Sequence, residues 1–533
     1  MKKLLLSLMS VSVVGTSATS VLACVSKNDT DIYLVQGNSG EIRDKSFNES
    51  AFNAGNNFLQ EVLGRKKNIS YVRVKDSETA TLTKAYNNAI RNKPKTLILP
   101  GFYHAVPDNG NNSAAGLMKG KGSTILIDAA DQIENQINIS YRGDVSGFYA
   151  GMAAIVTELG KDDAKEVKLG AFGGNSNPKS VDNFIVGYMS AIKVWNQTSV
   201  EDKTKLFASI DEQKASTWAK RDITVKTTQK ISPEATMKKN DTDWFSNSFV
   251  VGEAVPLLSK LDATVVMPVA GPQTADAISV TGKNFKIVGV DTDQSLAFEK
   301  GNFITSAEKA IESSTLISLA HTPEWKDVNL GEETVLTKTA KIVKESGLSL
   351  TRQDSKDGEF KDVDLAENKD WTNSVLWANG DMSSGGKNAL SNETKNAIKE
   401  IYTPKVLTEA SKDLFTYIDS QNAEFYNKYS IISKVSIDAY ANKIVTGKQM
   451  KNLSDDLDEL NLGELNDKEE ATILNAIFNK NSTVSKNELI ISEIKDNEAK
   501  VNIKDGSTVY NKLDSPLVIT FTIKSPASGN NIN

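Results

Sequence analysis

The chain has 533 residues, with 62 Lys and Arg against 68 Asp and Glu, a formal net charge of −6, one Cys and two His. One Cys excludes disulfide scaffolds, zinc ribbons and CxxC redox centres, and two His make a His-centred triad or multi-His metal site hard to build. The length predicts two or three domains, and the acidic balance argues against a nucleic-acid binder.

Residues 1–23 have the parts of a secretory signal: a basic start, an apolar run over 4–14 that is too short to span a bilayer, and small residues up to Ala23. Cys24, the only Cys, follows where bacterial lipoproteins are acylated. We therefore expect a lipid anchor at Cys24 that holds the mature protein on the extracellular face of the cell membrane. The alternative is an ordinary secreted protein in which Cys24 is incidental.

After a polar tether over 24–30, short apolar strands alternate with helices. The expected strands are 32–35, 69–74, 96–99, 124–127, 167–172, 263–269 and 285–290. The expected helices are 48–63, 80–91, 180–195 and, inside a polar insertion at 322–376, 336–346. This alternation predicts α/β structure, with parallel sheets covered on both faces in two lobes over 31–425.

Residues 430–533 have another composition, in which Asn, Lys, Asp and Leu are common and Gly is rare. Their pattern predicts a helix over 469–479 and strands with period-2 alternation over 489–494, 499–503 and 517–523. We expect a small α+β module that is separate from the lobes.

The densest polar motif runs from Asp44 to Gly55. Ser46 and Glu49 have the spacing of a capping box, so one interpretation is a well-capped helix. The other is a loop and helix N-terminus that hold a polar ligand. The spacing alone favours neither interpretation.

The remaining motifs carry little chemistry. Gly173-Gly174 after a strand favours a tight turn over a phosphate site, and the chain has no P-loop motif. Asp291 and Asp293 alone are weak evidence for a metal. His104 and His321 stand apart, and no nucleophile–base pair occurs at a useful spacing. We therefore expect no enzymatic activity, cofactor or metal.

Six stretches, in order, resemble the basic membrane protein family of ABC-transporter substrate-binding lipoproteins, which includes purine nucleoside receptors. They are Asp44-Lys-Ser-Phe-Asn-Glu-Ser-Ala-Phe52, Leu99-Pro-Gly-Phe102, Ile125-Leu-Ile-Asp128, Phe148-Tyr-Ala-Gly-Met-Ala-Ala154, Leu169-Gly-Ala-Phe-Gly-Gly174 with Phe184-Ile-Val-Gly-Tyr188, and Ile287-Val-Gly-Val-Asp-Thr-Asp-Gln294 with Thr305-Ser-Ala-Glu-Lys309. The resemblance covers 31–425.

The resemblance implies the type I periplasmic-binding fold, with two doubly wound α/β lobes and a hinge. The N-lobe would comprise about 31–145 and 290–320, and the C-lobe about 146–289 and 321–425. The tail, 430–533, resembles the repeat of spiralin-like surface lipoproteins.

In the family's nucleoside receptors two aromatic rings enclose the base, and carboxylates and a lysine hold the base edge and the ribose. The resemblance assigns the two rings to Phe52 and Phe245. It also implies that Asp44, Ser46 and Asn48 face the ligand from the first loop.

Four further contacts follow from the resemblance. Asp128 would meet the base edge, Asp291 and Lys309 would hold the ribose hydroxyls, and Gly271 would let the backbone come close to the ligand.

The function implied is a membrane-anchored, monomeric receptor that delivers a nucleoside, most plausibly a purine one, to an ABC permease with its ATPase subunits. We expect no nucleic-acid partner. The alternative is a surface adhesin or antigen without a transport role.

Overall fold

The computed structural model describes residues 28–38, 41–105, 112–129, 134–234, 236–353, 360–449, 452–481, 484–485, 488–504, 507, 510 and 513–524. The expected signal, the expected lipid site Cys24 and tether residues 24–27 lie outside the described residues. Across the described ranges, no helix combines the length and the apolar character needed to cross a membrane.

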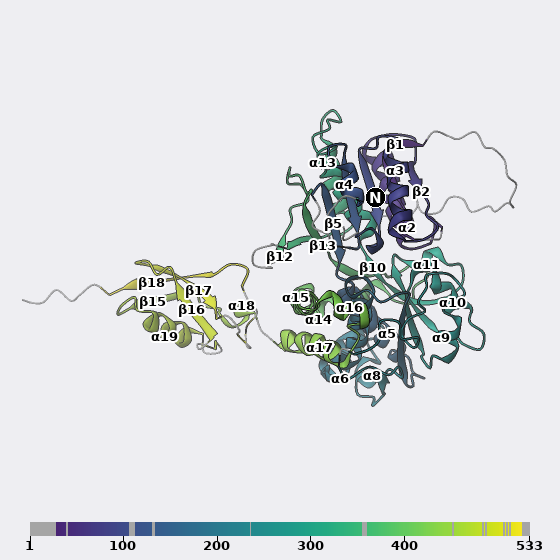
Figure 1. Cartoon of the computed structure of the whole chain (residues 1–533). Helices are drawn as coiled ribbons and strands as arrows, with labels where there is room; N and C mark the ends of the chain where they lie inside the picture. The colour runs from purple at the N-terminus through teal and green to yellow at the C-terminus, as the bar shows by residue number, and fades with distance from the viewer. Residues whose placement is uncertain are drawn as a thin grey trace, which may run out of the picture.

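The N-lobe is built on a sheet whose described strands have the order β12-β11-β13-β5-β4-β3-β1-β2 (Figure 1). Its strands are β1 Asp29–Val35, β2 Ile69–Val72, β3 Thr96–Pro100, β4 Ser123–Ile127, β5 Gln136–Tyr141, β11 Leu350–Gln353, β12 Phe360–Asp362 and β13 Ser374–Ala378. From β13 to β2 neighbouring strands are parallel, whereas β11 pairs antiparallel with both β12 and β13.

The C-lobe is built on a second sheet, in the order β14-β10-β9-β8-β6-β7. Its described strands are β6 Val167–Gly173, β7 Val225–Lys226, β8 Val265–Val269, β9 Lys286–Asp291, β10 Asn302–Lys309 and β14 Gly380–Met382. They are parallel except for β14, which is antiparallel to β10. Both lobes therefore share a doubly wound strand order that reverses beside its first strand, and ligands bind at such a reversal.

Alternate side chains of the N-lobe strands serve two cores. Ile32 and Leu34 of β1 pack in a core with helices α2 (Phe47–Asn57), α12 (Ile311–Ala320) and α13 (Val335–Lys344). Tyr33 and Val35 face the other core, which contains side chains of α3 (Thr79–Ile90) and α4 (Ala114–Met118). This period-2 alternation within an almost wholly apolar strand is what a sheet covered on both faces requires.

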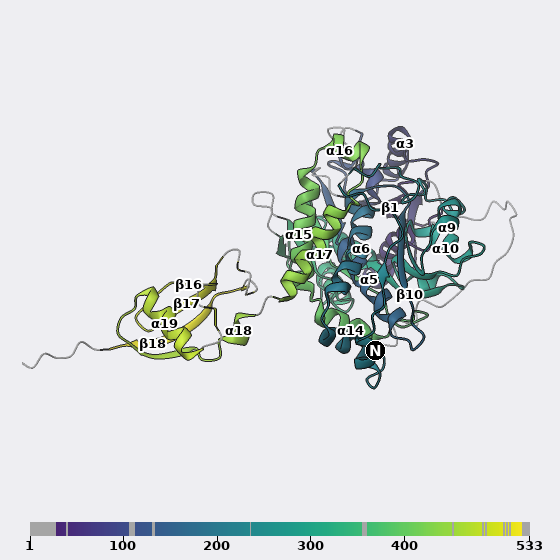
Figure 2. The same cartoon turned by 90° about the horizontal axis from the view of Figure 1, so that it is seen from below.

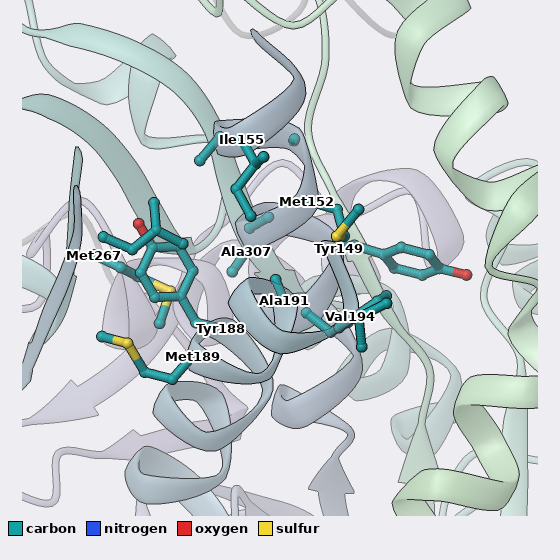
Figure 3. Close-up of a cluster of buried hydrophobic side chains, with 14 of the residues drawn as sticks. Tyr149, Met152, Ile155, Tyr188, Met189, Ala191, Val194, Met267 and Ala307 are labelled. Atoms are coloured by element: carbon teal, nitrogen blue, oxygen red, sulfur yellow. The ribbon is translucent and has the colours of Figure 1, made fainter. Parts of the chain in front are cut away.

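The C-lobe core is centred on two long helices, α5 (Gly143–Leu159) and α6 (Asn183–Gln197). Figure 3 shows Tyr149, Met152 and Ile155 of α5 facing side chains of α6, with Met267 of β8 and Ala307 of β10 beside them. The other face of the sheet is covered by α9 (Val255–Lys260) and α10 (Thr274–Ser279).

The chain passes between the lobes three times: from β5 to α5, from β10 to α12, and from β13 to β14. Two similar α/β lobes joined by three crossings confirm the predicted fold class, a two-lobed periplasmic-binding architecture.

The structure places two segments in a different lobe from the one expected. The N-lobe was expected to include 290–320, but β9 and β10 pair within the C-lobe sheet, and only α12 packs on the N-lobe. The C-lobe was expected to include 321–425, but β11, β12 and β13 extend the N-lobe sheet. The segment 322–376 is therefore part of the N-lobe, where β13 pairs with β5 and removes an open sheet edge.

After β14 the chain forms four helices that pack on the C-lobe. They are α14 Asn392–Ile401, α15 Pro404–Ser420, α16 Ala423–Lys428 and α17 Lys434–Gln449. Helix α17 packs against α6 and α15, and its Ile437, Tyr440 and Ile444 are buried in the C-lobe core. The expected boundary at 430 is therefore wrong, because α17 belongs to the lobe.

The tail module is a four-stranded sheet with helix α19 (Glu470–Lys480), built from described residues between 453 and 523. Its strands have the order β15-β18-β17-β16, with bounds β15 Asn461–Leu465, β16 Leu489–Ser492, β17 Glu498–Ile503 and β18 Leu517–Ile523. The module has its own apolar core and lies to one side of the lobes in Figures 1 and 2, and its Asp514 forms an ion pair at 3.8 Å with Lys405 of α15 (Pro404–Ser420). The α+β prediction for this segment therefore agrees with the structure.

We predict that a chain ending at residue 449 keeps the unfolding midpoint of the two lobes, whereas a chain ending at 430 loses stability. Without α17, Ile437, Tyr440 and Ile444 are missing from the C-lobe core, and each fully buried side chain of this size contributes about 1.5–3 kcal/mol. Urea unfolding followed by tryptophan fluorescence measures the difference. Equal midpoints for both truncations would show that α17 is not part of the lobe.

Candidate functional site

A cavity of about 710 Å³ lies between the lobes, at the carboxyl ends of both sets of strands. That volume is within the usual range for small-molecule sites. Its lining residues include Asp44, Ser46, Phe47, Asn48, Gly101, Phe102, Tyr103, Asp128, Ser180, Val181, Phe249, Val250, Val251, Gly271, Asp291, Phe298 and Lys309. Seven of the nine residues expected to bind a ligand are thus brought together.

The charged centre of the cavity is Lys309, at the end of β10. Its Nζ donates to Asp128 Oδ2 at 2.7 Å and lies 3.5 Å from Asp291 Oδ1. Asp128 follows β4 of the N-lobe, and Asp291 ends β9 of the C-lobe, so the ammonium group bridges the lobes. All three side chains are buried. An ammonium group is held at such a depth only when opposite charges and hydrogen bonds compensate its desolvation.

Both aspartates lie in the left-handed region, with φ of 65° for Asp128 and 67° for Asp291. Asp is among the residues that tolerate this region, and such conformations are concentrated at ligand sites. Burial raises the pKa of Asp128 to about 7, helped by the negative charge of Asp291 and opposed by Lys309. The carboxyl group of Asp128 is therefore protonated more readily than that of an exposed aspartate.

A second polar bridge joins the lobes at Ser46. The Ser46 hydroxyl donates to Asp291 Oδ2 at 2.6 Å. Gly271, which follows β8 with φ of 45°, lies against it, and a Cβ at this position would come within 2.9 Å of Ser46 Oγ. Gly271 is thus required for the close approach of the two lobes.

Asp44 caps helix α2. Its carboxylate accepts from the backbone N–H groups of Ser46, Asn48 and Glu49 and from Asn48 Nδ2. The Ser46 side chain makes no capping hydrogen bond, so the capping box of Ser46 and Glu49 does not form. Burial nevertheless raises the pKa of Asp44 to about 6, against the effect of these donors. The motif both caps the helix and lines the cavity.

The aromatic lining differs from the expectation. Phe52 belongs to the N-lobe core, where it lies edge-on to Tyr71, and Phe245 is buried in the C-lobe core. Neither ring lines the cavity. The rings that do line it are Phe47, Phe102 and Tyr103 from the N-lobe and Phe249 and Phe298 from the C-lobe. The structure therefore does not bring the two residues assigned to the sandwich to the cavity.

Phe249 is carried by a loop that the sequence did not single out. Ser246 Oγ donates to Gln273 Oε1 at 2.7 Å, and Gln273 Nε2 donates to the Val250 carbonyl at 2.9 Å. The Phe249 ring lies so close to Gly174 that a Cβ there would meet it at 2.4 Å. The absence of a side chain at Gly174 thus leaves space for the Phe249 ring. The only sign of this role in the sequence is that the glycine pair lies at the end of a strand.

The other candidates lie outside the cavity lining. His104 is buried and contacts Tyr86 OH through Nδ1 at 2.8 Å, and His321 stacks on Trp371. Asp293 accepts from Ser295 and Asn388. Within the described part of the chain, no group of three or more His, Cys, Asp or Glu side chains is arranged to hold a metal ion.

No family model and no curated protein matches the chain. Among solved structures, an ABC transporter solute-binding protein from Aeropyrum pernix K1 matches 78% of this chain and 98% of its own, at 16% identity and a TM-score of 0.38. A transcriptional activator of the comK gene from Bacillus halodurans matches 73% of this chain and 98% of its own, at 11% identity and a TM-score of 0.37. A periplasmic component of an ABC-type sugar transport system from Hahella chejuensis matches 59% of this chain and 94% of its own, at 12% identity and a TM-score of 0.34. Because these scores are below 0.5, the assignment of the fold rests on the sheets and crossings of the chain itself.

We predict that the free energy of unfolding falls as the pH rises from about 4 to about 7. Folding raises the pKa of Asp128 from 3.8 to about 7, so the folded chain binds this proton across a range in which the unfolded chain releases it. Asp44, with its pKa raised to about 6, acts in the same direction. In the Asp128→Asn variant the free energy of unfolding should fall less over the same pH range. Urea unfolding at several pH values measures this difference.

The matched control is Asp413→Asn, which removes a carboxylate from a surface ion pair with Lys443 and should leave the pH dependence of the parent chain. An unchanged pH dependence in Asp128→Asn would contradict the assignment of this titration to Asp128.

Proposed function

We propose that the chain is a solute-binding receptor of an ABC importer and that its cavity binds a nucleoside. The observation that carries the proposal is the composition of one cavity between the lobes: aromatic rings from both lobes line it together with a buried Lys309, Asp128 and Asp291. Rings suit the faces of a base, and carboxylates accept hydrogen bonds from ribose hydroxyls and base N–H groups.

The proposed base position lies between Phe249 of the C-lobe and the N-lobe rings Phe47 and Tyr103. Stacking on such rings contributes about 1–3 kcal/mol per base and tolerates different bases. Asn48, whose amide donates to Asp44, presents its remaining polar atoms beside Phe47 at the start of α2. Lys309, whose Nζ lies 5.5 Å from the centre of the Phe47 ring, and the two aspartates would then hold the sugar or the base edge.

The lobes are already bridged, which fits a receptor that encloses its ligand. Besides Lys309 and Ser46, Asn175 Nδ2 of the C-lobe donates to Tyr103 OH of the N-lobe at 3.3 Å. Opening these bridges admits the ligand, and closing them buries it, as in hinge-bending binding proteins. The closed form would dock on the permease, and the lipid at Cys24 would keep the receptor at the membrane.

A thermal-shift panel of nucleosides, free bases, sugars and amino acids tests this proposal on the mature chain. A purine nucleoside at 100 times its Kd should stabilise the chain by about 2.7 kcal/mol. No shift with any compound of the panel would reject the receptor and favour the surface protein without transport function. A thermal shift with sugars alone would support a solute-binding receptor whose ligand is a sugar and not a nucleoside.

We predict that Phe249→Ala weakens nucleoside binding about 5- to 150-fold, the equivalent of about 1–3 kcal/mol of stacking, and leaves the fold intact. Phe52→Ala should do the reverse: it should cost about 3–5 kcal/mol of stability because it empties a core position, yet leave the affinity of the folded chain unchanged. Calorimetric titration and urea unfolding separate the two effects. Loss of binding in Phe52→Ala with full binding in Phe249→Ala would restore the ring assignment made from the sequence.

We also predict that a nucleoside 5′-monophosphate binds at least about tenfold more weakly than its nucleoside, because like charges brought together without compensation cost several kcal/mol. The cavity lining carries four carboxyl groups, those of Glu41, Asp44, Asp128 and Asp291, against three basic groups, those of Arg43, Lys45 and Lys309. Arg43 and Lys45 are exposed, and Lys309 already has two carboxylate partners. Competition of the two compounds in the thermal-shift assay measures the ratio. Equal or tighter binding of the monophosphate would contradict this reading of the site.

A further inference from the structure

We propose that helices α15 to α17 form a third part of the hinge and couple closure of the two lobes to the position of the 453–523 module. This inference extends the proposed function, since it requires a chain that opens and closes, and it can also be tested without any ligand.

Helix α15 contacts both lobes at the crossings. Phe415 of α15 packs on Trp377 of the N-lobe strand β13, with ring centroids 4.4 Å apart. The same helix packs against α5 of the C-lobe. Arg142, at the crossing from β5 to α5, reaches Thr351 of the N-lobe sheet through Nη2 at 3.2 Å and the Thr408 carbonyl of α15 through Nη1 at 3.5 Å.

The short π-helix η3 (Pro178–Asp182) connects the cavity to the same helices. On its cavity side, Ser180 accepts from Lys309 Nζ at 3.2 Å through its carbonyl oxygen and donates to the Asp128 carbonyl at 2.8 Å. On its other side, Lys179 pairs with Asp419 of α15 at 2.6 Å. Such π turns inside helices are frequently found at functional sites.

Asp182 is the point where η3 holds the segment before α17. Its carboxylate is fully buried and accepts from Ser430 Oγ at 2.6 Å and from the Ile431 N–H at 3.3 Å. The same carboxylate also accepts from Ser176 Oγ at 2.9 Å and from the Asn177 N–H at 3.0 Å, so it joins its own turn to the segment that leads into α17. Loss of the Ser430 and Ile431 donors would remove two of the hydrogen bonds that compensate its burial. Ser180, which contacts Lys309 and Asp128 of the cavity, and Asp182, which contacts the segment before α17, are therefore two positions apart on one turn.

Movement of one lobe relative to the other must disturb this arrangement. Packed interfaces have discrete states and do not deform continuously. If α15 moves with the C-lobe, its Phe415 contact with Trp377 changes, and if η3 shifts with Lys309, the contact between Asp182 and Ser430 changes. Helix α17 ends at Gln449, and the module begins at Leu453. A change at Ser430 therefore acts on the segment that leads into α17, the last helix before the module, and from this we infer that closure affects the module.

Hydrogen exchange of the mature full-length chain, with and without inosine and guanosine, tests the coupling. Exchange in 430–434 should slow about tenfold with a nucleoside that binds, the size of an ordinary allosteric coupling. Asp182→Asn should bind the same nucleoside and lose this protection. Asp438→Asn, which removes an ion pair between α17 and Lys193 of α6 away from the cavity, is the matched control and should keep it.

A ligand-free arm separates failure of the coupling from failure of the proposed function. Lys309→Met removes the ammonium bridge between the lobes and should speed exchange in 430–434 as well as around the cavity. If a nucleoside protects only segments that line the cavity, the coupling is overturned. If no nucleoside binds, the nucleoside proposal fails, and unchanged exchange in 430–434 of Lys309→Met then overturns the coupling too.

Discussion

The ammonium group of Lys309, buried between Asp128 and Asp291, is the interaction on which the rest of the structure depends. Lys309 is the last residue of the C-lobe strand β10, yet its shortest ion pair is with Asp128 of the N-lobe. Because a buried charge without its partners costs several kcal/mol, this cluster favours the closed arrangement of the lobes. The Ser46 bridge and the close approach of Gly271 to Ser46 belong to the same contact between the lobes.

The alternation of apolar strands and helices could be read from the sequence, because both faces of each parallel sheet are buried and the strands are almost wholly apolar. Strand β5 escaped prediction because it is buried but polar: Gln136, Asn138 and Ser140 alternate with isoleucines. Their hydrogen bonds, such as the one from Asn138 to the Ser374 carbonyl of β13, form only when the distant segment returns. The placement of 322–376 was missed for the same reason.

The polar part of the site was expected from the family resemblance, and the structure brings Asp128 and Asp291 together because both lie at the carboxyl ends of strands. The rings could not be predicted, because their direction depends on the phase of a helix and the path of a loop. Phe47 and Phe52 are five residues apart on α2, which at 3.6 residues per turn puts them on different faces, one at the cavity and one in the core. Phe249 is positioned by Gln273 across a gap of more than twenty residues, a contact that sequence spacing does not encode.

The C-terminal third of the chain combines two kinds of structure that its composition does not separate. Helix α17 completes the C-lobe core, whereas the module after it has a core of its own. The change in composition comes before the change in structure, so the boundary was placed one helix too early. Phe415 of α15 contacts Trp377 of the N-lobe, and Ser430 contacts Asp182 of the C-lobe, so this helical segment is packed on the lobes before the module begins.

The most direct test of the central claim is calorimetric titration of the mature chain with purine nucleosides. The account predicts saturable binding with a Kd of about 1 μM or tighter, which corresponds to about −8 kcal/mol, and a negative heat-capacity change as the cavity loses its water. Absence of saturable binding for every nucleoside would contradict it.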